Sequence, residues 1–394
     1  MTGTDRPELL MLPSLPIYRN AEGRLYLTQK YHDGASEFSK SWPGTVTSLF
    51  FVTDALSTEM DLIEINLGDS GVEVRPTDKV ALQQRLQSAA VVTGHLAPRE
   101  SETAELCHDR QIPLFFTSEY TPKTESQIVD ANTKNPLLRM RRKLWIRSAE
   151  KVRQHLLRAY TTGLQCSGTP TYDLYHPLIS NALLFFDNRV RANHIISDAD
   201  LAAKFARLVE GHPLRLVFGG RLVAMKGVLE LLHVARELKK LNIPFTFDIV
   251  GDGPLEAPLR REMASLGDDR VRLRPPMDFR SGWIPFLRQE ADLFLCCHPQ
   301  GDPSSTYPEV MSCGVPIAGY DNEAWAGVLK NSGGGWHCPI RDSAGLARKV
   351  AELHVARNHL IDVARRGRDF AAEHCFENTF ARRTAHMAQA LSAT

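Results

Sequence analysis

Two cations follow a pair of glycines at the end of an apolar run that has the length of a β-strand. Gly219 and Gly220 come directly after Phe218, and Arg221 and Lys226 follow them. Glycines let a backbone approach a ligand closely because they carry no Cβ atom. Arg holds phosphate oxygens through paired hydrogen bonds, Lys acts as a point charge, and a helix beginning after Lys226 would add the partial positive charge of its N-terminus. The segment predicts a diphosphate site; a glycine turn with two surface cations is the alternative.

A second glycine-rich turn ends the next apolar run. Gly251 and Gly253 belong to a Gly-Asp-Gly-Pro sequence at residues 251–254. This sequence is a strong turn signal whether or not a ligand binds there. It becomes a candidate for ligand contact because it also follows a strand.

A third loop joins a further apolar run to a helix. Ser305 or Thr306 can cap this helix, which places Glu309 in its first turn. A carboxylate there can accept hydrogen bonds from two ribose hydroxyls, although the helix dipole alone would also favour a glutamate. The Ser304 hydroxyl and the neighbouring backbone amides could face an anion.

The elements that must position these loops alternate between strands and helices. The strands expected in the first half span 8–12, 46–52, 89–93, 114–117, 159–165 and 182–187, and the helices 25–36, 78–86, 101–110 and 137–157. The second half repeats the alternation from residue 214. Continuous apolar strands between helices are typical of parallel sheets covered on both faces. We therefore expect an α/β protein with two doubly wound, Rossmann-like domains.

A polar stretch near residues 188–200 separates the two series. We expect an N-terminal domain at 1–190, a C-terminal domain at 191–375, and a C-terminal helix at 376–394 that packs back toward the N-terminal domain. The chain length of 394 residues suits two domains. Ligands of such sheets bind outside the carboxyl ends of the strands, which is where the three loops lie.

In this order, the three loops resemble the motifs of retaining glycosyltransferase family 4, whose members have the GT-B architecture of two facing Rossmann-like domains. The resemblance covers residues 214 to about 376 well, while the first half matches mainly in its pattern of strands. In that family the first loop binds the donor diphosphate, a GxGP turn follows, and a later helix carries the ribose-binding carboxylate. The matching residues are Gly219, Arg221, Lys226 and Gly227, then Gly251, Gly253 and Pro254, and finally Glu309.

One departure from the family pattern concerns the donor sugar. The family usually has two glutamates separated by seven residues, and the first would fall at Gly301, beside Asp302. We expect Asp302 to take over the hydrogen bonds to the sugar hydroxyls; the alternative is that it only shapes an Asp-Pro turn. Ser304 stands where the family commonly has a glycine near the phosphate.

The N-terminal domain is expected to supply the acceptor side of the cleft. His95 follows one strand, and in the family a histidine in such a loop can approach the sugar, although a lone histidine is more often structural. Glu119 ends the next strand, where relatives often carry another histidine. Cys166 and Ser167 close a further strand and could line the acceptor pocket.

The resemblance implies a metal-independent, retaining hexosyltransferase that moves a sugar from a nucleotide-diphosphate sugar to a hydroxyl of a carbohydrate or lipid-linked acceptor, in surface polysaccharide or glycolipid synthesis. Arg221 and Lys226 would stabilise the leaving diphosphate, with Asp302 and His95 completing the catalytic set. The expected donor-binding residues are Gly219, Gly220, Gly251, Gly253, Ser304, Ser305, Thr306 and Glu309. A sugar-nucleotide epimerase of the same fold and a non-catalytic sugar-nucleotide-binding protein are the alternatives. The nucleotide, sugar and acceptor stay open.

The composition limits which kinds of partner and which cellular compartment we expect for the protein. With 47 basic and 46 acidic residues the net charge is +1, which does not indicate a nucleic-acid partner. The 7 cysteines form no CxxC pair and the 14 histidines no HExxH motif, so we expect a reducing compartment and neither a metal nor a cofactor. The N-terminus lacks a signal-peptide pattern, and no apolar run reaches the roughly 18 residues of a membrane span. A cytoplasmic protein is expected.

One segment, the helix expected at 137–158, is both basic and apolar. A basic amphipathic helix can bind anionic lipid headgroups. It predicts peripheral contact with the inner face of a membrane; a solvated helix face is the alternative.

Overall fold

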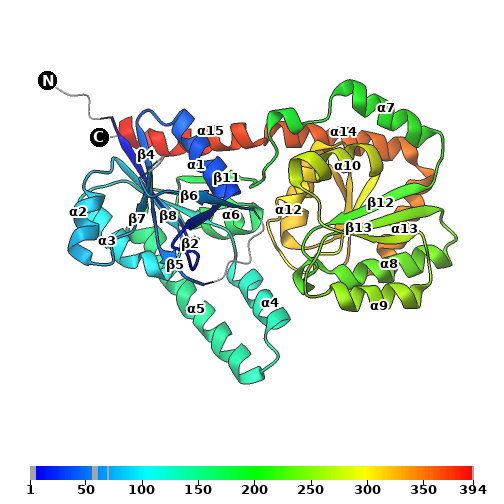
Figure 1. Ribbon diagram of the computed structural model, residues 1–394, viewed down its shortest axis with the longest axis horizontal. Helices are drawn as coiled ribbons and strands as arrows, with labels where there is room; N and C mark the ends of the chain where they lie inside the picture. The colour runs from blue at the N-terminus through cyan, green and yellow to red at the C-terminus, as the bar shows by residue number, and fades with distance from the viewer. Residues whose placement is uncertain (1–5, 56–60, 69–70, 393–394) are drawn as a thin grey trace.

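The computed structural model describes residues 6–55, 61–68 and 71–392, which form two Rossmann-like domains (Figure 1). The N-terminal domain is built on a seven-stranded sheet in which all paired neighbours run parallel. Across this sheet the strands are β11 (Ala182–Phe185), β10 (Gly163–Ser167), β9 (Leu114–Ser118), β8 (Val91–His95), β1 (Glu8–Leu12), β4 (Thr45–Phe50) and β7 (Val72–Val74).

Helices cover both faces of this sheet. One face carries α2 (Lys79–Leu86), α3 (Ser101–Asp109), α5 (Pro136–Ala159) and α6 (Thr169–Tyr175), and the other carries α1 (Gln29–Ser41) and α15 (Phe376–Ala388). Leu10 and Leu12 of β1 pack into the core on the first face, and Leu9 and Met11 into the core on the second. Since successive side chains of a strand point to opposite faces, burial on both sides explains the unbroken apolar run of β1.

The C-terminal domain is built on a six-stranded parallel sheet with a single large core. Its strands are, in order, β14 (Val271–Arg274), β13 (Phe245–Val250), β12 (Leu214–Gly219), β15 (Leu293–Cys296), β16 (Ile317–Tyr320) and β17 (Gly335–Cys338). Its helices are α7 (Asp198–Val209), α8 (Val228–Lys240), α9 (Glu256–Leu266), α10 (Ile284–Glu290), α11 (Thr306–Ser312), α12 (Glu323–Ser332), α13 (Ser343–Val355) and α14 (Arg357–Glu373). The short helical turns of the described chain are η2 (Pro98–Glu100), η3 (His176–Leu178), η4 (Ala192–His194), η5 (Ala224–Lys226), η6 (Phe279–Trp283) and η7 (Gln389–Ser392).

The prediction of a helix over residues 25–36 is wrong in its first part, because a small third sheet includes this part. Its strands are β5 (Val52–Thr53), β2 (Ile17–Arg19), β3 (Leu25–Thr28) and β6 (Leu62–Ile65). Residues of β3 pair with both β2 and β6, and the helix begins only at Gln29. The Thr28 side chain accepts a hydrogen bond from the Tyr31 amide, which fixes this later start.

The prediction of a strand at 159–165 is also wrong in its first part. Helix α5 continues to Ala159, and β10 begins only at Gly163. The sequence did not predict helix α4 (Pro122–Asn132), α6, α12 or β17.

The chain passes between the domains twice. It leaves the first domain after β11 and returns through α14 and α15, drawn in orange to red along one edge of Figure 1. The two passages are hydrogen-bonded, since the Phe376 amide donates to the Val190 carbonyl at 2.6 Å. Helix α15 then packs against α1, where the rings of Phe38 and Phe380 meet edge to face with centroids 4.8 Å apart.

The carboxyl ends of the two sheets face each other. Thr124, in the helix after β9, donates through its Oγ1 to the Gly301 carbonyl after β15, at 3.2 Å. Thr169 follows β10 and lies so close to Gly327 of α12 that a Cβ there would stand 1.6 Å from the Thr169 hydroxyl oxygen. The loop after β15 therefore lies where the domains meet, and η5 in the loop after β12 also packs against α4 of the first domain. Within the described ranges, no helix combines the length and the apolarity that a membrane span needs.

Candidate functional site

Close packing accounts for three of the predicted loop glycines. A Cβ on Gly251 would lie 2.0 Å from the Gly220 carbonyl oxygen, and one on Gly219 would lie 2.2 Å from the Trp283 ring. The two loops are also joined by the Leu222 amide, which donates to the Asp252 carbonyl at 2.6 Å. Gly251 and Gly253 therefore let the loops after β12 and β13 pack together, since a Cβ on Gly253 would lie 2.8 Å from the Leu222 carbonyl oxygen. Gly219 instead leaves room for the Trp283 ring.

The structure brings Lys226, Asp302 and Ser304 together. Lys226 Nζ donates to Asp302 Oδ2 at 2.6 Å and to Ser304 Oγ at 3.1 Å. Lys226 ends η5 after β12, whereas the other two lie after β15. Strands β12 and β15 are neighbours in the sheet, so their carboxyl ends meet at one edge.

The Lys226–Asp302 pair is largely shielded from solvent. The two side chains are 12% and 9% exposed. Desolvation strengthens the attraction of such a pair and makes an unpaired partner costly. Asp302 is thus a charged partner of Lys226 in addition to being part of a turn.

The loop after Ser304 leads into the short helix α11. Ser304 Oγ donates to Thr306 Oγ1 at 3.0 Å. Ser305 occupies the position before the helix, but its side chain makes no capping hydrogen bond, and neither does Thr306. The expected cap is therefore wrong, and the Thr306 hydroxyl instead extends the chain of contacts from Lys226.

Glu309, in the first turn of α11, pairs with an arginine from the inter-domain linker. Arg189 Nε donates to Glu309 Oε1 at 3.3 Å, and the Glu309 side chain is 5% exposed. The Glu309 charge raises the pKa of Arg189. The guanidinium also lies over the Phe279 ring, 4.3 Å from its centroid. Glu309 is held at the domain junction by this contact.

Arg221 does not join the Lys226 network. Its side chain is exposed and makes no hydrogen bond or ion pair with the described part of the chain. Burial and the charges of Glu119 and Asp302 raise the pKa of Tyr120, and Arg221 acts in the opposite direction. Arg221 therefore lies near the N-terminal domain with its guanidinium available.

Glu119 lies on the opposite wall, in an acidic environment. Its side chain reaches solvent, yet the surrounding protein and the charge of Asp187 raise its pKa, and Asp302 contributes in the same direction. Lys30 opposes this shift and is itself ion-paired with Asp187. The nearby carboxylates thus raise the Glu119 pKa from both sides of the domain junction, since Asp187 belongs to the first domain and Asp302 to the second.

The other acceptor-side candidates lie apart from this group. His95 is half-buried at the end of β8; burial and the charge of Arg99 lower its pKa to about 4, which makes it neutral near pH 7. Cys166 is fully buried in the hydrophobic core, where burial raises its thiol pKa to about 11. Ser167 is 5% exposed. Neither Cys166 nor Ser167 offers a side chain to an open pocket here.

Pockets occur along the junction of the domains. One narrow cavity is lined by Gly168 and Asp187 from the first domain and by Pro303 and Ser304 from the second. A larger pocket of about 620 Å³ lies between α4, α6 and α12. No three His, Cys, Asp or Glu side chains gather as a metal site within residues 6–55, 61–68 and 71–392.

Sequence reasoning missed Arg189, Asp187, Lys30 and Tyr120. Asp187 follows β11 and Tyr120 follows β9, so the strand-end rule that found Glu119 could have found them. Lys30 lies in α1 and Arg189 in the linker, and no local pattern marks either position.

The C-terminal domain also matches a known family. Residues 202–369 match the model of the family described as glycosyl transferases group 1. This stretch contains Arg221, Lys226, Asp302 and Glu309, and it spans less than half of the chain.

Curated relatives match over a similar length. The putative colanic acid biosynthesis glycosyltransferase WcaL of Salmonella typhimurium is 24% identical over 188 residues, 46% of this chain and 46% of that protein. The amylovoran biosynthesis glycosyltransferase AmsK of Erwinia amylovora is 27% identical over 162 residues, 38% of each chain. The match thus spans less than half the length of these relatives.

Solved structures match nearly the whole chain. The Anabaena protein Alr3699/HepE, crystallised in complex with UDP, superimposes with a TM-score of 0.66 at 13% identity, over 98% of this chain and 100% of that one. WaaG, a glycosyltransferase involved in lipopolysaccharide biosynthesis, gives a TM-score of 0.59 at 12% identity over 96% and 99% of the two chains. The fold is therefore GT-B, which confirms the expected class of two Rossmann-like domains.

Proposed function

We propose that the protein is a retaining, metal-independent glycosyltransferase that moves a hexose-type sugar from a nucleotide-diphosphate sugar to a hydroxyl acceptor. The observation that carries this proposal is the meeting of Lys226, Asp302 and Ser304 at the carboxyl ends of two adjacent strands. The family match over residues 202–369 supports it from the sequence.

Lys226 has the hydrogen-bonding capacity that a diphosphate needs. A lysine ammonium has three N–H donors. Asp302 and Ser304 each receive one hydrogen bond from Lys226. The third donor is thus left for a phosphate oxygen, while Asp302 fixes the direction of the side chain. Arg221, which is exposed, would close over the same diphosphate from the side of the N-terminal domain.

These cations would act on the leaving group. Departure of a nucleoside diphosphate places negative charge on its terminal oxygen, and fixed positive groups stabilise that charge as it develops. Glu309 would accept the ribose hydroxyls, and Asp302 the hydroxyls of the donor sugar. We propose that the acceptor hydroxyl attacks from the face that the diphosphate leaves and that a donor phosphate oxygen takes its proton, so no protein nucleophile is needed.

The names of the relatives support a surface polysaccharide as the kind of product. The relatives that match part of this chain are named as colanic acid and amylovoran biosynthesis glycosyltransferases. We propose a carbohydrate or lipid-linked acceptor for surface polysaccharide or glycolipid synthesis, and a cytoplasmic location at the inner face of a membrane.

Product analysis tests the proposal. The full chain is incubated with UDP-, GDP- and ADP-hexoses, with and without a lipid-linked or sugar acceptor and with and without EDTA. Transfer to an acceptor in the presence of EDTA, with retained anomeric configuration, is expected. Conversion of the donor sugar without an acceptor would instead identify an epimerase. Donor binding without any product would identify a sugar-nucleotide-binding protein.

A further inference from the structure

Helices α4 and α5 form a hairpin whose tip projects from the N-terminal domain (Figure 1). Helix α5 is anchored only in its second part, where Ile146, Ala149, Arg153, Leu156 and Leu157 are buried. None of the residues 136–145 is buried. The first turns of α5 therefore stand free of the core.

The tip is unusually apolar for an exposed helix. Leu137 is 73% exposed, Leu138 39%, Met140 57%, Leu144 53% and Trp145 62%. These five residues fall within nine positions, although only fourteen large hydrophobic side chains are exposed in all the described ranges. A cluster of this kind marks a surface that is covered by a partner, because leaving apolar area in water is unfavourable.

The same segment carries a concentrated positive charge. Residues 134–148 contain six Lys or Arg residues and no Asp or Glu, in a chain whose net charge is +1. Within the described chain, Lys143 pairs with Asp130 on α4, whereas Arg141 and Arg147 have no hydrogen-bonding or ion-pair partner. Cations thus remain available on the exposed face.

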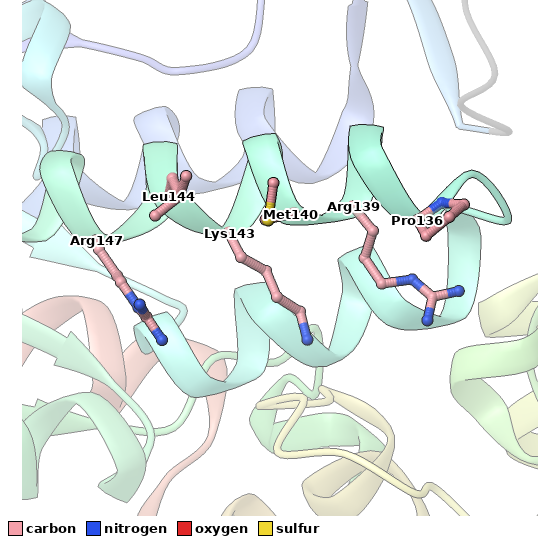
Figure 2. Close-up of a pocket in the computed structure, with 6 residues that line it drawn as sticks. All are labelled: Pro136, Arg139, Met140, Lys143, Leu144 and Arg147. Carbon is pink, nitrogen blue, oxygen red and sulfur yellow. The ribbon is translucent and has the colours of Figure 1, made fainter.

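The two kinds of side chain form adjacent rows. Figure 2 shows Arg139, Lys143 and Arg147 extending to one side of the helix, with Met140 and Leu144 in a second row beside them. Together with Pro136 they line a shallow groove of about 270 Å³. Their spacing of three and four residues places each row along one helix face.

We propose that this tip, residues 134–148, docks on a membrane surface that contains anionic lipids. Leucine, methionine and tryptophan side chains can enter the boundary between headgroups and acyl chains, while the flanking cations bind lipid phosphates. A second copy of the chain would bring two strongly positive tips together. A nucleic acid would neutralise the cations and leave the apolar side chains in water. The membrane satisfies both features.

This docking would place the candidate site next to the lipid surface. Helix α4, the other arm of the hairpin, packs against η5, which ends in Lys226. The hairpin therefore connects the proposed membrane contact to the loop that carries Lys226. The proposal stands independently of the proposed transferase activity.

Vesicle binding of the full chain tests the proposal. Wild-type protein is sedimented with phosphatidylcholine vesicles and with phosphatidylcholine–phosphatidylglycerol vesicles, at low and high salt. We expect binding to the anionic vesicles at least about tenfold stronger than to the neutral ones, and weaker binding at high salt. Trp145 fluorescence is expected to shift to shorter wavelength on binding, a change that the Trp145→Phe variant should lack.

Two variants separate the contributions of apolar and basic side chains. Leu137→Ser/Met140→Ser/Leu144→Ser and Arg141→Gln/Arg147→Gln are each expected to lower the affinity for anionic vesicles by about tenfold or more. Val209→Ser/Val355→Ser and Arg261→Gln/Lys330→Gln alter equally exposed residues of the C-terminal domain and are expected to bind like wild type. Thermal unfolding and nucleotide binding should be unchanged in all four variants.

Three results would overturn the proposal. The first is equal or absent binding to both kinds of vesicle. The second is wild-type vesicle binding by the variants of the tip. The third is a concentration-dependent dimer or an RNA complex that the tip variants abolish while vesicle binding is absent, which would assign the surface to that partner.

Discussion

Lys226 and Asp302 are 76 positions apart in the sequence, yet their side chains form a 2.6 Å hydrogen-bonded ion pair between adjacent strand ends. The pair orients the lysine and joins the loop after β12 to the loop after β15. A cation fixed in this way needs little reorganisation when a negatively charged ligand arrives. This relationship underlies the proposed diphosphate site.

The Asp302→Asn variant tests whether the charge of Asp302 matters. The hydrogen bonds that shape its loop come from backbone groups, since the Asp302 amide donates to Gln300 and its carbonyl accepts from Ser304. Asparagine can keep them, so the loop should persist. We expect turnover to fall by about 100-fold, with nucleotide affinity nearly unchanged, as measured by initial rates and calorimetry. Wild-type turnover would reduce Asp302 to a turn residue.

The Glu309→Gln variant tests the ribose contact. The wild-type protein should bind its preferred nucleoside diphosphate more tightly than the 2′-deoxy form, because a carboxylate accepts strong hydrogen bonds from hydroxyls. The variant should bind the nucleotide about tenfold more weakly and lose this preference. Glu290→Gln, which changes a surface partner of Arg215, is the control. Retained discrimination in the Glu309 variant would rule out the assigned contact.

Lys204 should make stability depend on pH. Burial lowers its pKa from 10.5 to about 7, and its Nζ contacts the carbonyls of Leu287 and Cys313 at 3.0 and 3.1 Å. Between these two pKa values the unfolded chain binds a proton that the folded chain does not, so this residue makes stability rise as the pH increases from about 7 toward 10.5. Below pH 7 its contribution is constant.

Thermal unfolding of Lys204→Met over this pH range checks the effect. The variant lacks the titrating group, so wild type should gain stability relative to it as pH rises, by an amount on the order of a few kcal/mol. The exposed Lys330→Met substitution should show no such trend. Parallel pH profiles for wild type and Lys204→Met would mean that the amine stays charged in the folded protein.

Arg383 should hold the C-terminal helix on the first domain. Its half-buried side chain places the guanidinium over the Phe185 ring, 4.3 Å from the ring centroid, and its Nε donates to Gln165 Oε1 at 2.8 Å. Burial lowers its pKa to about 10, so it remains charged near pH 7. Arg383→Met should lower the free energy of unfolding by about 1–3 kcal/mol. Arg382→Met, on the more exposed face of α15, should cost less; equal losses would contradict this role.

The doubly wound fold could be predicted because apolar strands buried on both faces leave a continuous signal, as in β1. The small third sheet could not, because its strands are short and mostly half-buried and carry no continuously buried apolar run. The local sequence of residues 25–28 is compatible with either a helix or a strand. Pairing with two neighbouring strands makes this segment a strand.

The positions of the candidate site residues were predictable to the extent that these residues follow strand ends. Lys226, Asp302 and Glu309 lie where the loop rule placed them, but the sequence could not show that Lys226 is paired while Arg221 is exposed. Arg189 reaches Glu309 from the linker, a contact between residues 120 positions apart that only the folded chain defines.

Calorimetric titration of UDP, GDP and ADP into wild type and into Lys226→Ala tests the central claim most directly. Arg261→Ala, an exposed cation of the same domain, serves as the control. Wild type and the control should bind at least one of the three nucleotides, and Lys226→Ala should bind it at least about 100-fold more weakly, because a charge-assisted contact to the diphosphate is lost. Equal affinity in Lys226→Ala, or no binding of any nucleoside diphosphate by wild type, would contradict the account.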